Sequence, residues 1–190
     1  PQPVQGRKRV TSGRGDGDTA LRGVADVDWE RWQPRDTATL LFVVRGSEVL
    51  LIRKKRGLGA GKINGPGGRL EPGETPAAAA ERELYEELRV RPRTSPSFHG
   101  ELRFQFVDGY SMRVFVFRAD DCEGEPTETE EAIPLWTPVE RLPFDEMWAD
   151  DRLWLPAALS GKRVEGAFVF DGDALLDHTL ALCGEGSAGD

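Results

Sequence analysis

Runs of apolar residues, separated by glycine, proline and charged residues, divide most of the chain into short segments. Thr37–Val44 and Val49–Ile52 are continuous apolar runs rich in β-branched residues, which is typical of buried strands. Phe98–Val107 and Met112–Arg118 alternate apolar and polar residues on either side of Asp108-Gly109, a dipeptide that favours a hairpin turn. The first two thirds of the chain therefore predict a sheet of antiparallel strand pairs.

The C-terminal part adds further strands and one helix. The strands are predicted at Ile133–Thr137, Ala167–Phe170 and Ala174–Leu180. A helix is predicted from about Asp151 to Leu159, in which Pro156 is tolerated only in the opening turns. The acidic segment Cys122–Glu131 is predicted to be a loop. Strands combined with two helices predict an α+β fold, in which a mixed sheet lies between helices in an α/β/α sandwich.

The other helix is predicted within Gly67–Val90, the most informative stretch of the chain. Thr75 suits the N-cap and Pro76 suits the first helical position, where its missing N–H costs nothing. One apolar stripe follows at helical spacing, formed by Ala77, Ala80, Leu84 and Leu88. A helix that buries this stripe against the sheet is expected.

Three glutamates lie near the C-terminal end of this helix. At about 100° per residue, Glu87 falls at the border of the buried stripe, Glu83 beside it, and Glu86 on the outer side. Carboxylates this close repel one another, and a half-buried one is costly unless a cation compensates it. A hard divalent cation such as Mg²⁺ is the usual partner, although the acids alone also fit a solvated charged helix.

Composition limits the class of protein. The chain has 190 residues and a formal net charge of −8, which excludes a general nucleic-acid binder with a basic surface. We expect one domain at residues 26–183, between a disordered tail at 1–25 and a second tail at 184–190. Cys122 and Cys183 form neither a metal-ligand spacing nor a disulfide framework, which favours a cytoplasmic protein. No apolar run is long enough to cross a membrane, so no membrane partner is expected.

The segment before the predicted metal helix, Arg53–Gly68, is dense in glycine and in lysine and arginine. Glycine lets the backbone approach a ligand closely, and the cations attract phosphates. A flexible surface loop has the same composition. Its place directly before the helix favours the phosphate-binding interpretation.

The spacing of the acids resembles the signature box of the Nudix hydrolases. Gly68, five residues, Glu74, seven residues and then Arg82–Glu87 (RELYEE) match that box. The resemblance implies cleavage of a nucleoside diphosphate linked to another group, with Mg²⁺ or Mn²⁺ as cofactor. It also implies catalytic and metal-ligating roles for Glu83, Glu86 and Glu87 and a metal-ligating role for the Gly67 carbonyl. The closer resemblance given below adds Glu131, which lies outside the box, to the catalytic and metal-ligating residues.

One position departs from the box, and one pair of residues has a structural explanation. Arg89 stands where the box expects a glycine that would end the helix in a left-handed conformation, which costs an arginine free energy. Arg82 and Glu74 are expected to form a pair that holds the loop against the helix.

Over residues 37–182 the chain resembles the oxidised purine nucleoside triphosphate hydrolases, or 8-oxo-dGTP diphosphatases, among the Nudix hydrolases. The matching segments are Lys54–Gly57, Gly59–Gly61, Asn64-Gly65, Glu131–Trp136, Leu142–Phe144, Met147-Trp148, Asp150-Asp151, Trp154 and Pro156. The resemblance implies pocket positions for Thr39, Lys54 and Phe104. It is interrupted where this chain has Leu58, Ile63 and Pro66 in place of aromatic residues.

The residues of this pocket suit a purine on physical grounds. Trp148 offers a platform on which a base stacks, although it also fits a core tryptophan. Asp150 and Asp151, held close together, cannot both ionise easily, so one can keep its proton and donate to the base. A helix cap is the alternative for this pair. Asn64 carries both a donor and an acceptor for the other base edge, and it also fits an Asn-Gly turn.

The resemblance thus implies an enzyme of nucleotide-pool sanitation, related to DNA repair. Its substrate is a modified purine nucleoside triphosphate, its products are a nucleoside monophosphate and pyrophosphate, and polymeric nucleic acid is not a partner. We expect a monomer. Two alternatives remain: a Nudix enzyme for another nucleoside diphosphate derivative, which has no need of Trp148 with Asp150-Asp151, and a non-catalytic nucleotide-binding module, which would have lost box acids.

Overall fold

A computed structural model describes residues 21–185 of the chain. Its α-helices are α1 (Pro76–Leu88) and α2 (Asp151–Leu159), and its short 3-10 helices are η1 (Val24–Asp26), η2 (Val139–Arg141) and η3 (Phe144–Glu146). The strands are β1 (Asp36–Arg45), β2 (Glu48–Lys54), β3 (Ile63–Asn64), β4 (Arg91–Pro92), β5 (Ser97–Phe106), β6 (Ser111–Asp120), β7 (Cys122–Glu123), β8 (Ala132–Pro138), β9 (Lys162–Asp171) and β10 (Ala174–Glu185).

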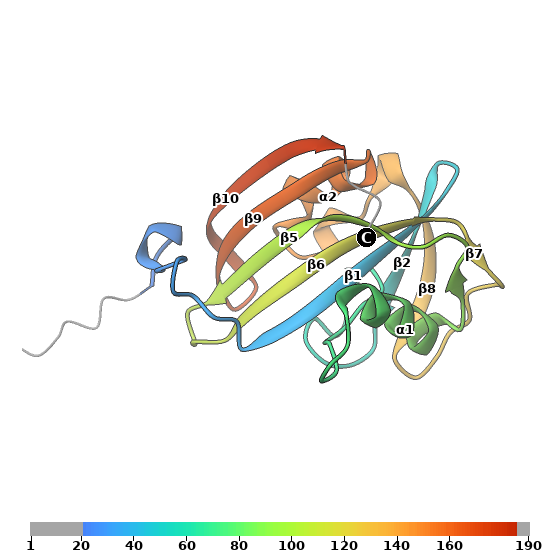
Figure 1. Cartoon of the computed structure of the whole chain (residues 1–190), viewed down its shortest axis with the longest axis horizontal. Helices are drawn as coiled ribbons and strands as arrows, with labels where there is room; N and C mark the ends of the chain where they lie inside the picture. Colours follow the sequence, from blue (N-terminus) through green and yellow to red (C-terminus); the bar gives the residue numbers. More distant parts are fainter. Residues whose placement is uncertain (1–20, 186–190) are drawn as a thin grey trace, which may run out of the picture.

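In this part of the chain the strands form one large mixed sheet in the order β10-β9-β5-β6-β1-β2-β3, with β8 paired to β2 (Figure 1). The pairs β1–β6 and β5–β9 are parallel, and the other neighbours are antiparallel. A parallel pair needs a crossover connection, and the segment that carries α1 and the segment that carries α2 supply such connections. The strands β4 and β7 pair separately.

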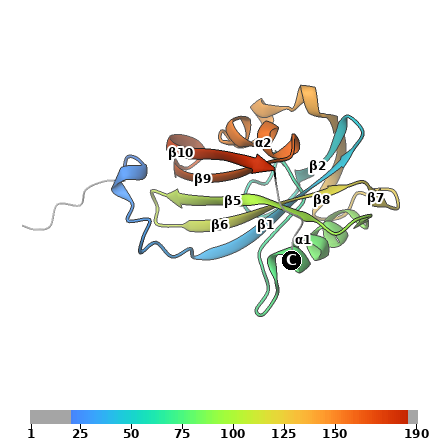
Figure 2. The same ribbon diagram turned by 45° about the horizontal axis from the view of Figure 1, so that its top comes forward.

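The two α-helices cover opposite faces of the sheet (Figure 2). The apolar stripe of α1 is buried as predicted, because Ala80, Leu84 and Leu88 pack with Leu41 and other residues of the sheet in one core cluster. Trp154, Leu155 and Ala158 of α2 pack into a second cluster on the other face. The sandwich of sheet and helices predicted from the sequence is confirmed.

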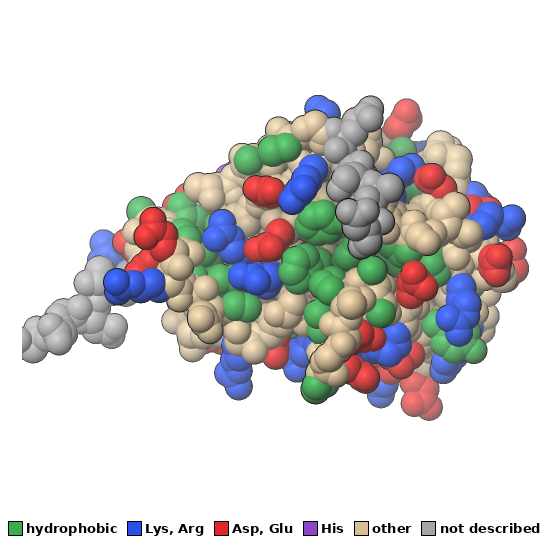
Figure 3. Space-filling model, in the orientation of Figure 1, with side chains coloured by type: hydrophobic (Ala, Val, Ile, Leu, Met, Phe, Trp, Pro, Cys, Tyr) green, Lys and Arg blue, Asp and Glu red, His purple; other side chains and the backbone are tan. Residues whose placement is uncertain are grey.

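The helix α1 covers only the part of its face near β1, β6 and β8, where it packs. Beside it, the outer surface of β5, β6 and β9 carries side chains of both charges (Figure 3). They include the ion pairs Glu101–Arg113 at 3.3 Å and Arg163–Glu165 at 3.4 Å. None of the helices in the described range is long and apolar enough to cross a membrane.

The glycine-rich segment Arg53–Gly68, called the glycine loop below, fills the space where β1 and β2 diverge. These strands pair only from Val43–Leu50 to Arg45–Glu48. Beyond that point the backbone of the loop bonds to β1 instead: the amide of Leu41 donates to the carbonyl of Pro66 at 2.8 Å, and the amide of Thr39 to that of Gly68 at 2.9 Å. The loop before α1 is therefore held against the centre of the sheet.

Several element boundaries differ from the sequence prediction. Residues 1–20 and 186–190, which contain most of the predicted tails, lie outside the described residues. Within the described part, η1 belongs to the predicted tail 1–25 but is bonded to the sheet, since the amide of Val24 donates to Asp177 Oδ2 at 2.9 Å. The last strand continues to Glu185, one residue beyond the start of the predicted tail at 184.

Trp29 and Trp32 lie over the sheet, and Trp32 donates to Gln105 at 2.9 Å.

Candidate active site

The helix α1 begins as its sequence predicts. The Thr75 hydroxyl accepts from the amide of Ala78 at 3.3 Å, and Pro76 takes the first helical position. At the other end Arg89 is left-handed, with φ 62° and ψ 23°, and its amide donates to the Tyr85 carbonyl at 2.9 Å. The arginine thus adopts the conformation that the expected glycine would provide.

Glu87 is the most deeply buried of the box acids, with 2% of its surface exposed. Its Oε2 accepts from the amide of Gly67 at 2.9 Å, and its Oε1 lies 3.9 Å from Lys54 Nζ. Burial raises the pKa of this carboxyl to about 8, and the nearby Lys54 and the Gly67 amide only partly oppose the increase. Glu87 is a desolvated carboxylate whose charge is incompletely compensated by the protein.

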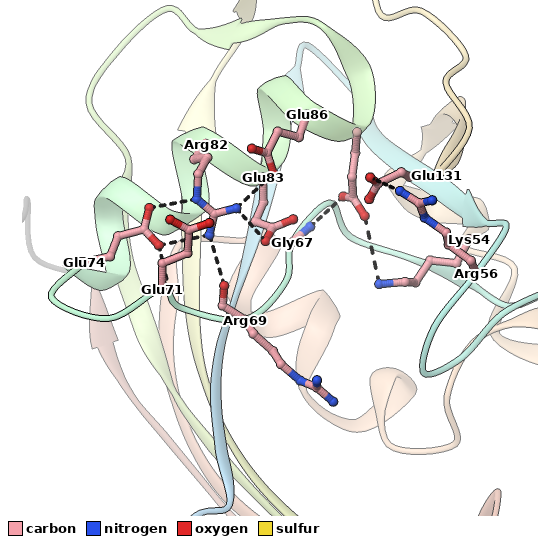
Figure 4. A network of polar contacts seen from close by, with 11 residues as sticks. Lys54, Arg56, Gly67, Arg69, Glu71, Glu74, Arg82, Glu83, Glu86 and Glu131 are labelled. Atoms are coloured by element: carbon pink, nitrogen blue, oxygen red, sulfur yellow. Dashed lines mark hydrogen bonds and ion pairs between the residues drawn. The ribbon is translucent and has the colours of Figure 1, made fainter.

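The other two box acids share one arginine (Figure 4). Arg82 Nη1 donates to Glu83 and to Glu86, each at 2.9 Å. Burial raises the pKa of Glu83, although Arg82 opposes it. Glu83 is partly buried and Glu86 is exposed, which confirms the order of burial predicted from the helical spacing.

Arg82 also holds the loop, as expected from the sequence. Its Nε and Nη2 donate to the two oxygens of Glu74 at 2.9 Å, and Nη2 also donates to the Arg69 carbonyl at 3.0 Å. These bonds lower the pKa of Glu74. The Arg82–Glu74 pair therefore has the structural role predicted for it.

Glu131 enters from the segment before β8, far from the box in sequence. Its carboxylate pairs with Arg56 of the glycine loop. The charge of Glu131 also contributes to the raised pKa of Glu87. Within residues 21–185 no three acidic, cysteine or histidine side chains form a preformed metal-ligand cluster, and Arg82 and Arg56 pair with three of the four candidate acids.

Two glycines allow the loop to approach these acids. A Cβ on Gly67, whose φ is 156°, would lie 2.0 Å from the Thr39 carbonyl oxygen. A Cβ on Gly68 would lie 2.4 Å from the Glu83 carboxylate. A side chain at Gly67 would collide with the backbone of β1, so this position requires glycine. A side chain at Gly68 would displace the carboxylate of Glu83 from the loop.

A cavity of about 290 Å³ opens beside this loop. It is lined by every substrate-binding residue predicted from the sequence: Thr39, Lys54, Asn64, Phe104, Trp148, Asp150 and Asp151. Gly67 and Gly68 also line it, so the cavity reaches from the α2 side of the sheet to the loop beneath the box acids. The sequence reasoning missed Arg69, Phe106, Met112 and Phe170, which line the same space.

Trp148 forms an aromatic wall of this cavity. Its ring meets Phe170 edge-on, with centroids 5.8 Å apart and planes at 88°, and Phe106 at 6.4 Å and 76°. The Lys62 ammonium lies 4.9 Å from its ring centroid. Trp148 is only partly buried and faces a cavity, which favours the platform over a core tryptophan.

The adjacent aspartates are almost completely buried, at 2% exposed for Asp150 and 3% for Asp151. Asp150 Oδ2 accepts from the Trp154 indole at 2.8 Å, and Asp151 Oδ2 from the Trp148 amide at 3.0 Å. Burial raises the pKa of Asp150 to about 6. Burial and the neighbouring Asp150 raise the pKa of Asp151 well above its usual value.

The pair lies at the start of α2, but the side-chain bond that a helix cap requires does not form. Asp150 precedes the first residue of α2 but makes no side-chain bond to the amides of that helix. The bonds that both carboxyls do make are to an indole and to a preceding amide. Both residues line the cavity, and neither carboxyl is engaged by an amide of α2.

Thr39 and Asn64 supply further polar groups. Thr39 Oγ1 is buried in the cavity wall and has no hydrogen-bond partner within the described residues. Asn64 lies in strand β3 and lines the cavity, and its Oδ1 accepts from the Gly65 amide at 2.8 Å; the alternative of a simple Asn-Gly turn is wrong. Leu58 is exposed and lines the cavity, whereas Ile63 is part of the core.

Comparison with known proteins agrees with this geometry. The NUDIX domain family matches residues 34–158. The chain is 46% identical over 144 residues to the oxidized purine nucleoside triphosphate hydrolase of Danio rerio and 42% identical over 144 residues to that of Mus musculus, each time covering 75% of this chain and 92% of the relative. Its fold is similar to that of a MutT protein from Bacillus halodurans, with a TM-score of 0.67 and 26% identity over 76% of this chain and 97% of the other.

Proposed function

The chain belongs to the Nudix hydrolases, and on this premise we propose that it hydrolyses oxidised purine nucleoside triphosphates to a nucleoside monophosphate and pyrophosphate. One observation carries the proposal. A single cavity is lined by Trp148 and the buried Asp150-Asp151 pair and also by the Gly67-Gly68 loop that contacts the box acids. Groups suited to a base and groups suited to phosphates thus share one space.

The base end of the cavity suits an oxidised purine. Trp148 provides a flat surface, and stacking of a base on an aromatic side chain is worth ~1–3 kcal/mol. Oxidation of a purine changes the donors and acceptors on its edge. An aspartate pair with raised pKa values supports one protonated and one ionised carboxyl, which together donate and accept. The unpartnered hydroxyl of Thr39 adds a group that does both.

The acid end fits a divalent cation. Glu87 is buried and only partly compensated by Lys54 and the Gly67 amide, and the neighbouring candidate ligands are all oxygen atoms, which suits a hard ion. We propose Mg²⁺, with Mn²⁺ as a substitute, held by Glu83, Glu86, Glu87, Glu131 and the Gly67 carbonyl. When bound, such an ion neutralises phosphate charge and makes water more acidic.

The remaining site residues have defined tasks in this proposal. Arg82 orients Glu83 and Glu86 and ties them to the loop through Glu74. We propose that Glu131 serves as a further metal ligand or accepts a proton from the attacking water; its pairing with one exposed arginine, Arg56, leaves it able to change partners. Gly67 and Gly68 keep backbone rather than side chains next to the phosphates.

We further propose that the enzyme acts as a monomer on free nucleotides in the cytoplasm. Residues of one chain line the whole cavity, so no second copy is required to complete it. Cys122 and Cys183 are both free, which suits a reducing compartment.

Product analysis with 8-oxo-dGTP tests the proposed reaction. We expect 8-oxo-dGMP and pyrophosphate in equal amounts, dependent on Mg²⁺. Release of inorganic phosphate with 8-oxo-dGDP would contradict the proposed bond cleavage. A parallel reaction with a dinucleotide polyphosphate and a sugar nucleotide covers the other Nudix substrates, and faster turnover of either would overturn the assignment.

A further inference from the structure

We propose that Lys62 is a positioning residue of the base pocket, whose ammonium holds the Trp148 ring from outside the cavity and places a positive charge near the Asp150-Asp151 pair. The inference rests on the proposed function and concerns its base end alone. Lys62 belongs to the glycine loop, where the abundance of lysine and arginine favoured phosphate binding. Its contacts in the structure give this lysine a different partner.

Lys62 is fixed at the point where the glycine loop returns to the sheet. Its amide donates to the Gly59 carbonyl at 2.9 Å, and its carbonyl accepts from the Lys54 amide at 3.0 Å. The side chain is 25% exposed, and its Nζ lies 2.9 Å from Asp173 Oδ2 in the turn between β9 and β10. Lys62 does not line the cavity that the described residues form. The ammonium is therefore engaged outside the cavity and is not presented to a phosphate within it.

The Trp148 ring depends on the glycine loop for its position. Trp148 lies between η3 and α2, outside both helices. The Lys62 ammonium lies 4.9 Å from the centroid of its ring, and a Cβ on Gly59 would lie 3.1 Å from its indole Nε1. A cation over tryptophan is the most favourable kind of cation–π contact. Because the ring lines the cavity whereas Lys62 and Gly59 do not, the loop supports the platform from outside the cavity.

The same lysine acts on the aspartate pair. The Trp148 amide donates to Asp151 Oδ2 at 3.0 Å, so a residue that holds Trp148 also holds the partner of this carboxyl. Burial and the neighbouring Asp150 raise the pKa of Asp151, whereas the Trp148 amide and the charge of Lys62 lower it. In the described part of the chain, two further cations line the cavity, namely Lys54 and Arg69. Removal of the Lys62 charge alone should therefore raise the pKa of Asp151 and move the titration of the pair to higher pH.

The ion pair with Asp173 has the role of an anchor. The side chain of Asp173 is 70% exposed, and an ion pair with such an exposed partner contributes little to stability. The contact does fix the position of the ammonium, and the ammonium fixed in this way lies over Trp148. The turn between β9 and β10 is thus connected through Lys62 to the base platform.

Binding of two partial ligands tests the inference. The nucleoside 8-oxo-2′-deoxyguanosine reports on the base end and inorganic tripolyphosphate with Mg²⁺ on the phosphate end, each measured by isothermal titration calorimetry. Lys62→Met keeps the length of the side chain and removes its charge. It should weaken nucleoside binding about two- to tenfold, the range of one cation–π contact, and leave tripolyphosphate binding within about twofold. The pH dependence of nucleoside binding should move to higher pH.

Two further variants separate the charge of Lys62 from its packing and from the net charge of the protein. Lys62→Arg should restore most of the nucleoside affinity and the wild-type pH dependence, because a guanidinium also pairs with a carboxylate and lies over an aromatic ring. Lys162→Met is the matched control. It removes the same charge from an exposed position at the start of β9 that does not line the cavity, and it should change none of these values.

Equal nucleoside binding by wild type and Lys62→Met would overturn the inference, as would an equal loss for nucleoside and tripolyphosphate. A second measurement, the free energy of unfolding from pH 5 to 8, needs no ligand. A carboxyl whose pKa is raised in the folded state loses stability as pH rises, so this loss should extend to higher pH in Lys62→Met than in wild type. Identical pH dependence in the two proteins would also overturn the inference. Failure of the proposed function appears separately, as a wild-type enzyme that prefers a substrate other than oxidised purines, and the unfolding comparison then still tests the effect of Lys62 on Asp151.

Discussion

Replacing Asp150 by Asn should make the protein more stable and the enzyme less active. The carboxyl of Asp150 is 2% exposed and accepts one bond, from the Trp154 indole at 2.8 Å. An asparagine has nearly the same shape and can keep that bond through its carbonyl oxygen. The substitution therefore removes a buried ionisable group while leaving the packing intact.

The size of the effect follows from the pKa of Asp150, which burial raises from 3.8 to about 6. Between these two pH values the unfolded chain has lost its proton and the folded chain keeps it, so the free energy of unfolding falls as pH rises. At ~1.36 kcal/mol per pKa unit, the loss reaches about 3 kcal/mol above pH 6. Asparagine does not titrate. The variant should lack this loss. The difference in free energy of unfolding between Asp150→Asn and wild type should therefore be up to about 3 kcal/mol more favourable to the variant at pH 7.5 than at pH 4.

The assay is urea unfolding of both proteins at several pH values from 4 to 7.5. Asp145→Asn is the matched control, because that aspartate lies nearby with a side chain 100% exposed and should leave the pH dependence unchanged. The same Asp150→Asn protein should lose about 5- to 150-fold in kcat/KM on oxidised purines, since a buried polar edge loses its partner at a cost of ~1–3 kcal/mol. Asp151→Asn should show a loss of similar size but with a different ratio between 8-oxo-dGTP and 2-hydroxy-dATP.

Two results would refute this reasoning. If Asp150→Asn keeps the wild-type dependence of unfolding free energy on pH, Asp150 does not titrate in the buried state described. If both variants match wild type on both nucleotides, the aspartates do not recognise the base.

Three further predictions concern the box. Glu87→Gln should reduce kcat on the order of 10²-fold or more while the circular dichroism spectrum stays native. Near-normal turnover in saturating Mg²⁺ would contradict a metal-binding role for Glu87. Arg89→Gly should stabilise the protein by roughly 0.5–1 kcal/mol, because glycine adopts the left-handed conformation of Arg89 without strain. The Tyr85 ring keeps its nearer cation, Arg91 at 4.6 Å. A lower melting temperature of the variant would show that the backbone of Arg89 is not strained. Removal of divalent cations by EDTA should abolish hydrolysis and added Mg²⁺ restore it, and activity that survives EDTA would exclude a metal-dependent mechanism.

The parts of the fold set by local sequence were predictable. The hairpin at Asp108-Gly109 and the cap at Thr75 each depend on residues within a few positions, whereas the left-handed conformation of Arg89 could not be predicted from an arginine in place of glycine. The burial order of Glu83, Glu86 and Glu87 follows from helical spacing alone. The short strands β3, β4 and β7 were not predictable, because two-residue pairings depend on which distant segments meet.

The candidate site divides in the same way. The resemblance of sequence segments identified the predicted substrate-binding residues, and all of these line the cavity, whereas Leu142–Phe144 and Met147 of the same matching segments do not. Lys62 appeared in the sequence as one of several cations of the glycine loop, because its contacts with Trp148 and Asp173 join segments far apart in the chain. Phe106 and Phe170 alternate like other strand residues, and only the parallel pairing of β5 with β9 brings them together. The pairing of Arg56 with Glu131 joins residues 75 positions apart.

The most direct test of the central claim is the ratio of kcat/KM between oxidised and normal nucleotides, measured as Mg²⁺-dependent pyrophosphate release. The pairs are 8-oxo-dGTP with dGTP and 2-hydroxy-dATP with dATP, and Glu87→Gln serves as the inactive control. We predict that at least one oxidised nucleotide is preferred over its normal counterpart by about tenfold or more, the discrimination expected of one or more buried hydrogen bonds to the altered base edge. Equal values for both members of both pairs would contradict the account.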